Sequence, residues 1–221
     1  MTIKGYIDAK ETIRNAKLKG ITVNEYIETM WNIRGRTKKI IDKLLSIAKL
    51  KPQSHCLEIG AGTGRYLSEL KRIYSEITCE IYEPNEDWAA WIQEQYSLKG
   101  LTRRNPDGYS LKDTKTGTID LCSAHAVFTY LDTMVTFFYL KEASRCLCKG
   151  GYLFFDIIDM DRQDIVTIID QNIVDKPSYM ILLSQKAIIN FLEKLHVHLL
   201  DKFLLPYDND FSTYLLFQKH I

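Results

Sequence analysis

The sequence of 221 residues predicts an α/β fold: a mostly parallel sheet of seven strands, with helices on both faces and an antiparallel hairpin at its C-terminal end. From residue 54 onward, apolar runs of strand length alternate with stretches of helical periodicity, a pattern typical of parallel sheets covered by helices. Two strand-like runs, residues 196–204 and 213–219, then close the chain. The intervening Pro206-Tyr207-Asp208-Asn209-Asp210 is typical of a hairpin turn.

Residues 1–50 are predicted to form a helical extension ahead of a sheet domain at residues 51–221. Apolar residues recur in the extension at helical spacing, enough for two or three helices, and Thr22 followed by Glu25 has the form of a capping box. Pro52 ends the helical pattern, because the residue before a proline disfavours helical geometry. The first strand is therefore expected just after it.

The elements of the sheet domain follow from the periodicity of apolar residues and from turn signals. In chain order they are a strand at 55–59, a helix at 63–74, a strand at 78–83, a helix at 86–96, strands at 101–103 and 119–124, a helix at 133–147, a strand at 152–157 and helices at 163–173 and 184–195. Gly150 and Gly151 are expected to end the helix at 133–147, because glycine favours the left-handed conformation found after helices. Ser184 is expected to cap the last helix.

Composition argues against several functional classes. Hydrophobic residues make up 46% of the chain and charged residues 26%, as in ordinary soluble proteins. The 29 basic and 28 acidic residues give a net charge of +1, which argues against a nucleic-acid partner. No apolar run approaches the roughly 18 to 20 residues of a membrane span, and no N-terminal secretion signal is recognisable, so a cytoplasmic location is expected.

The cysteines lie in apolar runs, and no two of them have the two-residue gap typical of metal or redox sites. They are Cys56, Cys79, Cys122, Cys146 and Cys148. We expect them to be small buried hydrophobic residues, and we expect no metal.

Residues 56–67, with the sequence CLEIGAGTGRYL, predict a strand, a glycine-rich turn and the start of a helix. Three alternating glycines indicate a turn that lies against a ligand, because glycine accepts positive φ and lets the backbone approach closely. A dinucleotide-binding turn needs a further glycine at the sixth position, where this sequence has Arg65. Pyrophosphate binding is therefore disfavoured, and an ordinary glycine-rich turn between strand and helix stays open.

Glu58 followed by glycines at 60, 62 and 64 resembles motif I of the class I S-adenosylmethionine-dependent methyltransferases. Residues 119–131, IDLCSAHAVFTYL, resemble motif IV in its non-nucleic-acid form, since the Pro-Pro-aromatic element of the DNA N-methyltransferases is absent. Residues 140–153, LKEASRCLCKGGYL, resemble the segment after motif IV, and the terminal hairpin resembles the pair of strands that closes the sheet in this family. The resemblance implies a Rossmann-like fold with S-adenosylmethionine as cofactor.

The resemblance also implies where each part of the cofactor binds. The glycine turn would lie beneath the methionine part, Glu83 would accept hydrogen bonds from both ribose hydroxyls, and Asp107 with the amide of Gly108 would recognise adenine. The implied cofactor-binding residues are Glu58, Gly60, Ala61, Gly62, Gly64, Glu83, Pro84, Asp107, Gly108 and Ala124. Two alternatives stay open: Glu83 as an acid in a solvent-facing loop, and the Pro-Asp-Gly segment around Asp107 as an ordinary turn.

His125 follows the strand at 119–124, where the resemblance places the mouth of the acceptor pocket. Histidine is the side chain best suited to remove a proton near neutral pH, so His125 is a candidate general base. The alternative is that it caps the loop structurally. If His125 has no catalytic role, Asp156 and Asp159 at the end of the fifth strand are the next candidates.

The predicted function is transfer of a methyl group from S-adenosylmethionine to a small-molecule acceptor, with oxygen preferred as the acceptor atom and a sugar or glycan hydroxyl as the first candidate. Such a displacement depends mainly on aligning donor and acceptor and on excluding water, so it needs no nucleophilic triad or metal cluster. Two alternatives stay open: an NAD-dependent oxidoreductase, and a non-catalytic nucleoside-binding subunit of a partner protein.

The acceptor is expected to contact the parts of the chain outside the resemblance. Candidate residues are Tyr26, Trp31 and Arg34 in the N-terminal extension and Asp159, Asp161 and Arg162 after the fifth strand. For Trp31, packing in a core is the preferred interpretation, because a tryptophan on an apolar helix face is usually buried.

Overall fold

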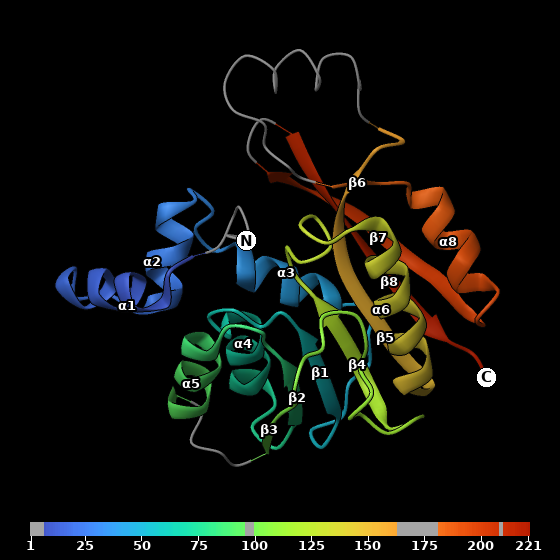
Figure 1. Cartoon of the computed structure of the whole chain (residues 1–221), viewed down its shortest axis with the longest axis horizontal. Coiled ribbons are helices and arrows are strands. Elements are labelled where there is room, and N and C mark those ends of the chain that lie inside the picture. The colour runs from blue at the N-terminus through green and yellow to red at the C-terminus, as the bar shows by residue number, and fades with distance from the viewer. Residues whose placement is uncertain (1–6, 96–99, 163–180, 208–209) are drawn as a thin grey trace.

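The computed structural model describes residues 7–95, 100–162, 181–207 and 210–221. It consists of one twisted sheet flanked by helices, with two further helices beside it (Figure 1). The helix predicted at residues 163–173 lies outside the described residues.

Seven strands form the main sheet in the order β3-β2-β1-β4-β5-β8-β7. Their bounds are β1 His55–Ile59, β2 Thr78–Tyr82, β3 Leu101–Arg103, β4 Ile119–Ala124, β5 Leu147–Asp159, β7 Val197–Tyr207 and β8 Asp210–Lys219. The first five are mutually parallel, whereas β8 runs antiparallel to both β5 and β7. The two-residue strand β6, Leu182–Leu183, adds an eighth strand beside the end of β5. The predicted fold class, with its antiparallel C-terminal pair, is confirmed.

Helices precede and connect the strands. Their bounds are α1 Ala9–Leu18, α2 Val23–Met30, α3 Arg36–Leu45, α4 Arg65–Ile73, α5 Glu86–Gln95, α6 Thr133–Cys146 and α8 Gln185–Glu193. The capping box predicted for α2 is present, because the Thr22 side chain accepts from the Glu25 amide while the Glu25 carboxylate accepts from the Thr22 amide. Ser184 caps α8 as predicted, and its hydroxyl accepts from the amide of Ala187.

Two apolar cores lie on the two faces of the sheet. Helices α6 and α8 pack on one face, and α3, α4 and α5 pack on the other. A third, small core joins α1 and α2 to Trp88 of α5. The predicted boundary at residue 50 between the helical extension and the sheet domain stays a prediction. Helix α3 lies before this boundary, yet its Ile40, Ile41 and Leu44 pack in the core of the sheet domain.

The segment between α6 and β5 differs from the prediction. Helix α6 ends at Cys146 and β5 begins at the next residue, so Gly150 and Gly151 lie inside the strand and do not cap the helix. A Cβ on Gly151 would lie 2.7 Å from the carbonyl oxygen of Ile119, where the pairing of β4 with β5 shifts register. Gly151 is therefore required for close approach of two strands.

The remaining composition-based expectations concern membranes and cysteines. Within the described residues, no helix combines the length and the apolar character needed to cross a bilayer. All five cysteines are unpaired, four are buried, and Cys148 is partly exposed. They are small hydrophobic residues of the sheet and of α6, as expected.

Candidate active site

The glycine turn between β1 and α4 combines a packed glycine with an open one. Gly60, Gly62 and Gly64 have φ values of 63°, 54° and 72°. A Cβ on Gly60 would lie 2.7 Å from Cγ2 of Val127, so that glycine is required by packing against the loop after β4. At Gly62, in contrast, a Cβ would meet no heavy atom within 4 Å. The turn therefore leaves space for a ligand above Gly62.

Glu83 lies immediately beside this turn. Its Oε2 accepts a hydrogen bond of 2.7 Å from the amide of Gly62, and its Oε1 accepts one of 2.8 Å from the amide of Asn85. Only 5% of Glu83 is exposed, so the solvent-facing alternative is wrong, while the neighbouring Pro84 is exposed. Burial raises the pKa of this carboxyl despite the two amide donors.

Glu58 on β1 precedes the glycine turn, and Arg65 at the start of α4 follows it. Glu58 is 6% exposed on β1, and burial raises its pKa to about 8 although Arg65 opposes this shift. The backbone of Leu67 in the first turn of α4 also acts to lower this pKa. Ala61, between these residues, is buried.

Asp107 follows β3 in a turn that its own side chain stabilises. Its carboxylate accepts from the amides of Tyr109 and Ser110 and from the Ser110 hydroxyl, at 3.1, 2.8 and 2.6 Å. Partial burial opposes ionisation, but the Ser110 and Tyr109 donors lower the pKa of Asp107 to about 2. These bonds are those of the ordinary turn that the sequence left open, and Gly108 within it has a φ of 91°. Contact with adenine stays a prediction.

The exit of β4 holds His125 in an aromatic environment. Ala124 is 1% exposed and His125 is 7% exposed. The imidazole stacks on Tyr66 at a centroid distance of 3.7 Å and meets the edge of Phe154 at 5.5 Å. Burial lowers the pKa of His125 well below its usual value, and the nearby guanidinium groups add to this effect. The environment favours the structural alternative, because a general base must reach the proton that it removes.

Asp156 on β5 fixes the loop after β4. Its Oδ1 accepts a 2.7 Å hydrogen bond from the amide of Ala126, a residue with a positive φ of 54°, and its Oδ2 accepts a 2.5 Å bond from the Ser212 hydroxyl. Asp156 is 2% exposed, and burial raises its pKa. The carboxylate thus holds a strained non-glycine residue in place next to His125.

The two acids after Asp156 support helix α8. Asp159 is 1% exposed, and its Oδ1 accepts from the amides of Asp161 and Gln185. Asp161 accepts from the Ser184 hydroxyl and from the amide of Lys186, so its carboxylate stabilises the N-terminus of the helix. A structural role accounts for Asp161, while a role for Asp159 or Arg162 in acceptor binding stays a prediction.

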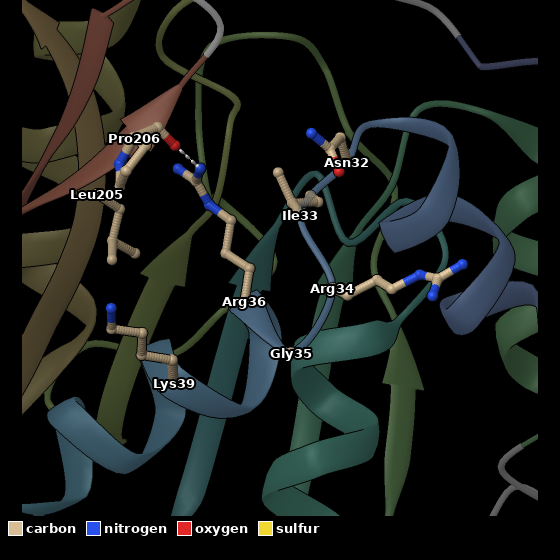
Figure 2. A pocket seen from close by; sticks show the side chains of 8 residues that line it. All are labelled: Asn32, Ile33, Arg34, Gly35, Arg36, Lys39, Leu205 and Pro206. Carbon is tan, nitrogen blue, oxygen red and sulfur yellow. Dashed lines mark hydrogen bonds between the residues drawn. The ribbon is translucent and has the colours of Figure 1, made fainter.

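A cavity of about 210 Å³ lies between the start of α3 and the end of β7. It is lined by Asn32, Ile33, Arg34, Gly35, Arg36, Lys39, Leu205 and Pro206. Figure 2 shows Arg36 and Lys39 directed toward Leu205 and Pro206, while the Arg34 guanidinium points away from them. The Arg36 guanidinium donates to the carbonyl oxygen of Pro206 and so connects the N-terminal helices to β7.

Glu28 of α2 fixes one wall of this cavity. Its carboxylate accepts from the amides of Gly35 and Thr37, at 2.6 and 2.9 Å, at the N-terminus of α3. Of the aromatic residues proposed for acceptor binding, Tyr26 packs against α1, where its hydroxyl accepts from Asn15. The preferred interpretation of Trp31 as a core residue is wrong, because 52% of it is exposed at the end of α2.

Sequence reasoning missed most of the residues at the cavity and those that pack around His125. Leu205 and Pro206 lie about 170 residues from Arg36, and no local pattern connects them. Tyr66 and Tyr214, which pack with His125, were also not singled out. Of the residues that line the cavity, the sequence singled out Arg34 as a candidate for acceptor binding.

Comparison with known proteins supports the predicted resemblance. Residues 57–155 match the model of the family described as "Methyltransferase domain". The resemblance to the class I S-adenosylmethionine-dependent methyltransferases is therefore confirmed over this part of the chain. Among solved structures, the fold is similar to magnesium protoporphyrin IX methyltransferase from Synechocystis PCC 6803 with bound SAH, with a TM-score of 0.67, 11% identity and coverage of 98% of this chain and 90% of that one. It is also similar to a SAM-dependent methyltransferase from Aquifex aeolicus, with a TM-score of 0.62, 14% identity and coverage of 96% and 99%.

A curated relative is much longer than this methyltransferase. The chain is 27% identical over 179 residues to the polyketide synthase-nonribosomal peptide synthetase phmA of Phaeosphaeria nodorum. The match covers 72% of this chain but 4% of that protein's length.

The site fits the family's cofactor, S-adenosylmethionine. The open space above Gly62 is the volume that a side chain would fill, and Glu83 lies within hydrogen-bonding distance of that glycine's amide. A carboxylate oxygen has a second lone pair, so Glu83 retains acceptor capacity for hydroxyl donors. Two observations favour S-adenosylmethionine over NAD. Residues 57–155 match a methyltransferase domain, and Arg65 stands where a dinucleotide-binding turn has its last glycine.

Proposed function

We propose that this methyltransferase binds S-adenosylmethionine over the glycine turn and transfers its methyl group to a small-molecule acceptor. The observation that carries the proposal is the contact between Glu83 and the amide of Gly62 beside open space. A carboxylate at the end of β2, next to a turn in which Gly62 faces open space, suits a nucleoside whose ribose lies over β2 and whose remaining part crosses the end of β1.

The chemistry follows from this placement. The acceptor's lone pair attacks the methyl carbon, the carbon–sulfur bond breaks, and S-adenosylhomocysteine leaves as the second product. The protein's task is to align donor and acceptor and to exclude water, which together supply much of the rate acceleration in such displacements. A hydroxyl acceptor also loses its proton during the reaction, to a side chain or to water.

For the acceptor we propose an oxygen nucleophile on a small molecule, with sugar or glycan hydroxyls as the first class to test. The cavity of about 210 Å³ beside α3 is smaller than the roughly 300–1,000 Å³ of pockets for drug-sized ligands, which favours a small acceptor group. Its polar lining from Asn32, Lys39 and the backbone at Gly35 suits hydrogen-bonding groups. Residues 1–50 are proposed to carry the acceptor side of the site.

The experiment is an acceptor screen with isotopically labelled S-adenosylmethionine. Purified protein is incubated with sugars, other small hydroxyl compounds and matched amines, and labelled products are separated from the cofactor. Labelled hydroxyl compounds, absent when Gly62→Val replaces the wild type, support the proposal. Labelling of amines alone would refute the oxygen acceptor. Cofactor binding without product from any small molecule would favour the alternative, a non-catalytic subunit.

A further inference from the structure

Arg65 is a cation at the glycine turn that forms no ion pair with the residues that the structure describes. It is the first residue of α4, directly after Gly64, and its side chain is only partly exposed. Its Nη2 donates to the Tyr66 hydroxyl at 3.1 Å, and its Cζ lies 4.9 Å from the centre of the Tyr66 ring. Its Nη1 is buried and has no hydrogen-bond partner among the described residues. Buried guanidinium nitrogens are normally paired, so this one has the capacity to donate to a ligand.

The carboxylates nearest Arg65 are committed to other donors. Asp156 accepts from Ala126 and Ser212, and Glu28 accepts from Gly35 and Thr37. Burial raises the pKa of Glu58 to about 8, which disfavours its charged form near neutral pH. In the part of the chain that the structure describes, no carboxylate lies within ion-pair distance of Arg65. The guanidinium is therefore left without a direct ion pair in this part of the chain.

Arg65 and Glu83 mark opposite sides of β1. Strand β2, which ends next to Glu83, pairs with one edge of β1, and β4, which ends next to His125, pairs with the other. Arg65 donates to the Tyr66 hydroxyl, and the Tyr66 ring stacks on His125 directly after β4, so the guanidinium lies toward the β4 side. A ligand whose ribose lies at Glu83 and which crosses Gly62 therefore reaches Arg65 with its other end.

We propose that Arg65 binds the α-carboxylate of the methionine part of S-adenosylmethionine and of S-adenosylhomocysteine. This inference rests on the proposed function, because it assumes the cofactor. The carboxylate is the one anionic group of either molecule, and a guanidinium forms strong, charge-assisted hydrogen bonds to carboxylates. Packing against Tyr66 holds the group in position before the ligand arrives, which reduces the entropy lost on binding.

The test compares two ligands that differ only in this carboxylate. They are S-adenosylhomocysteine and its decarboxylated analogue, titrated by calorimetry into the wild type, Arg65→Met and Arg65→Lys. Arg72→Met serves as the control, because Arg72 lies on the same helix and pairs with Glu69 on the surface. Arg65→Met should weaken S-adenosylhomocysteine about ten- to hundredfold, as expected for hydrogen bonds to a charged group, and should change the affinity of the analogue less than about threefold.

Three results overturn the proposal. In Arg65→Met, the affinity for both ligands could fall equally, which indicates a purely structural role, or it could fall for neither. The wild type could also bind both ligands with equal affinity. The wild-type comparison and Arg65→Lys keep the test decisive if Arg65→Met does not fold. Absence of binding by either ligand to the wild type would instead count against the proposed function itself.

Discussion

The ribose assignment predicts that Glu83 matters more for cofactor affinity than Asp107 does. Glu83 connects β2 to the glycine turn through Gly62, and its carboxylate is proposed to accept from two ribose hydroxyls. Asp107, in contrast, is surrounded by donors from its own turn. Replacing Glu83 by alanine therefore removes the proposed hydrogen bonds to the ribose, whereas replacing Asp107 mainly removes bonds within its own turn.

The magnitude follows from the hydrogen bonds. A hydrogen bond to a charged group is worth about 1.5–3 kcal/mol, so the loss of two at Glu83→Ala costs about 3 kcal/mol or more. At about 1.4 kcal/mol per factor of ten, this corresponds to a roughly hundredfold weaker complex. Asp107→Ala removes one contact to adenine at most and should weaken binding about tenfold.

The assay is calorimetric titration of S-adenosylhomocysteine into each variant, with thermal melts to confirm folding. Glu83→Ala also removes the bond that positions Gly62, so a second ligand separates the two effects. A derivative that lacks one ribose hydroxyl should bind the wild type more weakly, yet should bind Glu83→Ala about as well as the complete ligand does. Equal or reversed losses for the two alanine variants would show that the ribose assignment is wrong.

Three further predictions concern the turn, the buried acid and the histidine. Gly62→Val should abolish cofactor binding in calorimetry, because the valine side chain fills the open space at the turn. Gly117→Val, at another open glycine with positive φ, should retain binding. Similar losses of affinity in both variants would refute the reasoning. The pKa of Glu58 is raised to about 8, so the native state keeps a proton that the unfolded state loses above about pH 4.5, and stability falls as pH rises through this range. Glu58→Gln should therefore gain melting temperature relative to the wild type between pH 5 and 8, and a constant difference would contradict this. His125→Ala should destabilise the fold by about 3 kcal/mol, as for other buried aromatic residues, and should weaken cofactor binding. A hundredfold fall in turnover with unchanged cofactor affinity would instead identify His125 as the base.

The sequence predicted the sheet well because its strands are continuous apolar runs separated by glycine and proline turns. The bounds of β1, β3 and β4 agree with the predicted ranges. The start of β5 and the role of its two glycines were mispredicted, since a glycine pair is a common helix stop and nothing local shows that Gly151 must pass close to β4. Local patterns report backbone preference, whereas this glycine is fixed by a tertiary contact.

For the candidate site, the sequence placed the glycine turn and Glu83 but not their surroundings. The contact of Glu83 with Gly62 agrees with the predicted proximity of the two motifs. The burial of His125 under Tyr66 and the pairing of Arg36 with Pro206 depend on residues far apart in the chain. Such contacts form only when the fold brings distant segments together, so a motif search does not detect them.

The central claim is that the glycine turn binds S-adenosylmethionine, and calorimetry with purified protein tests it most directly. Titrations with S-adenosylmethionine, S-adenosylhomocysteine and NAD are run under identical conditions, with Gly62→Val as the negative control. The account predicts affinity in the micromolar range for the first two ligands and no measurable heat with NAD. Binding of NAD together with no detectable heat from millimolar S-adenosylmethionine or S-adenosylhomocysteine would contradict it.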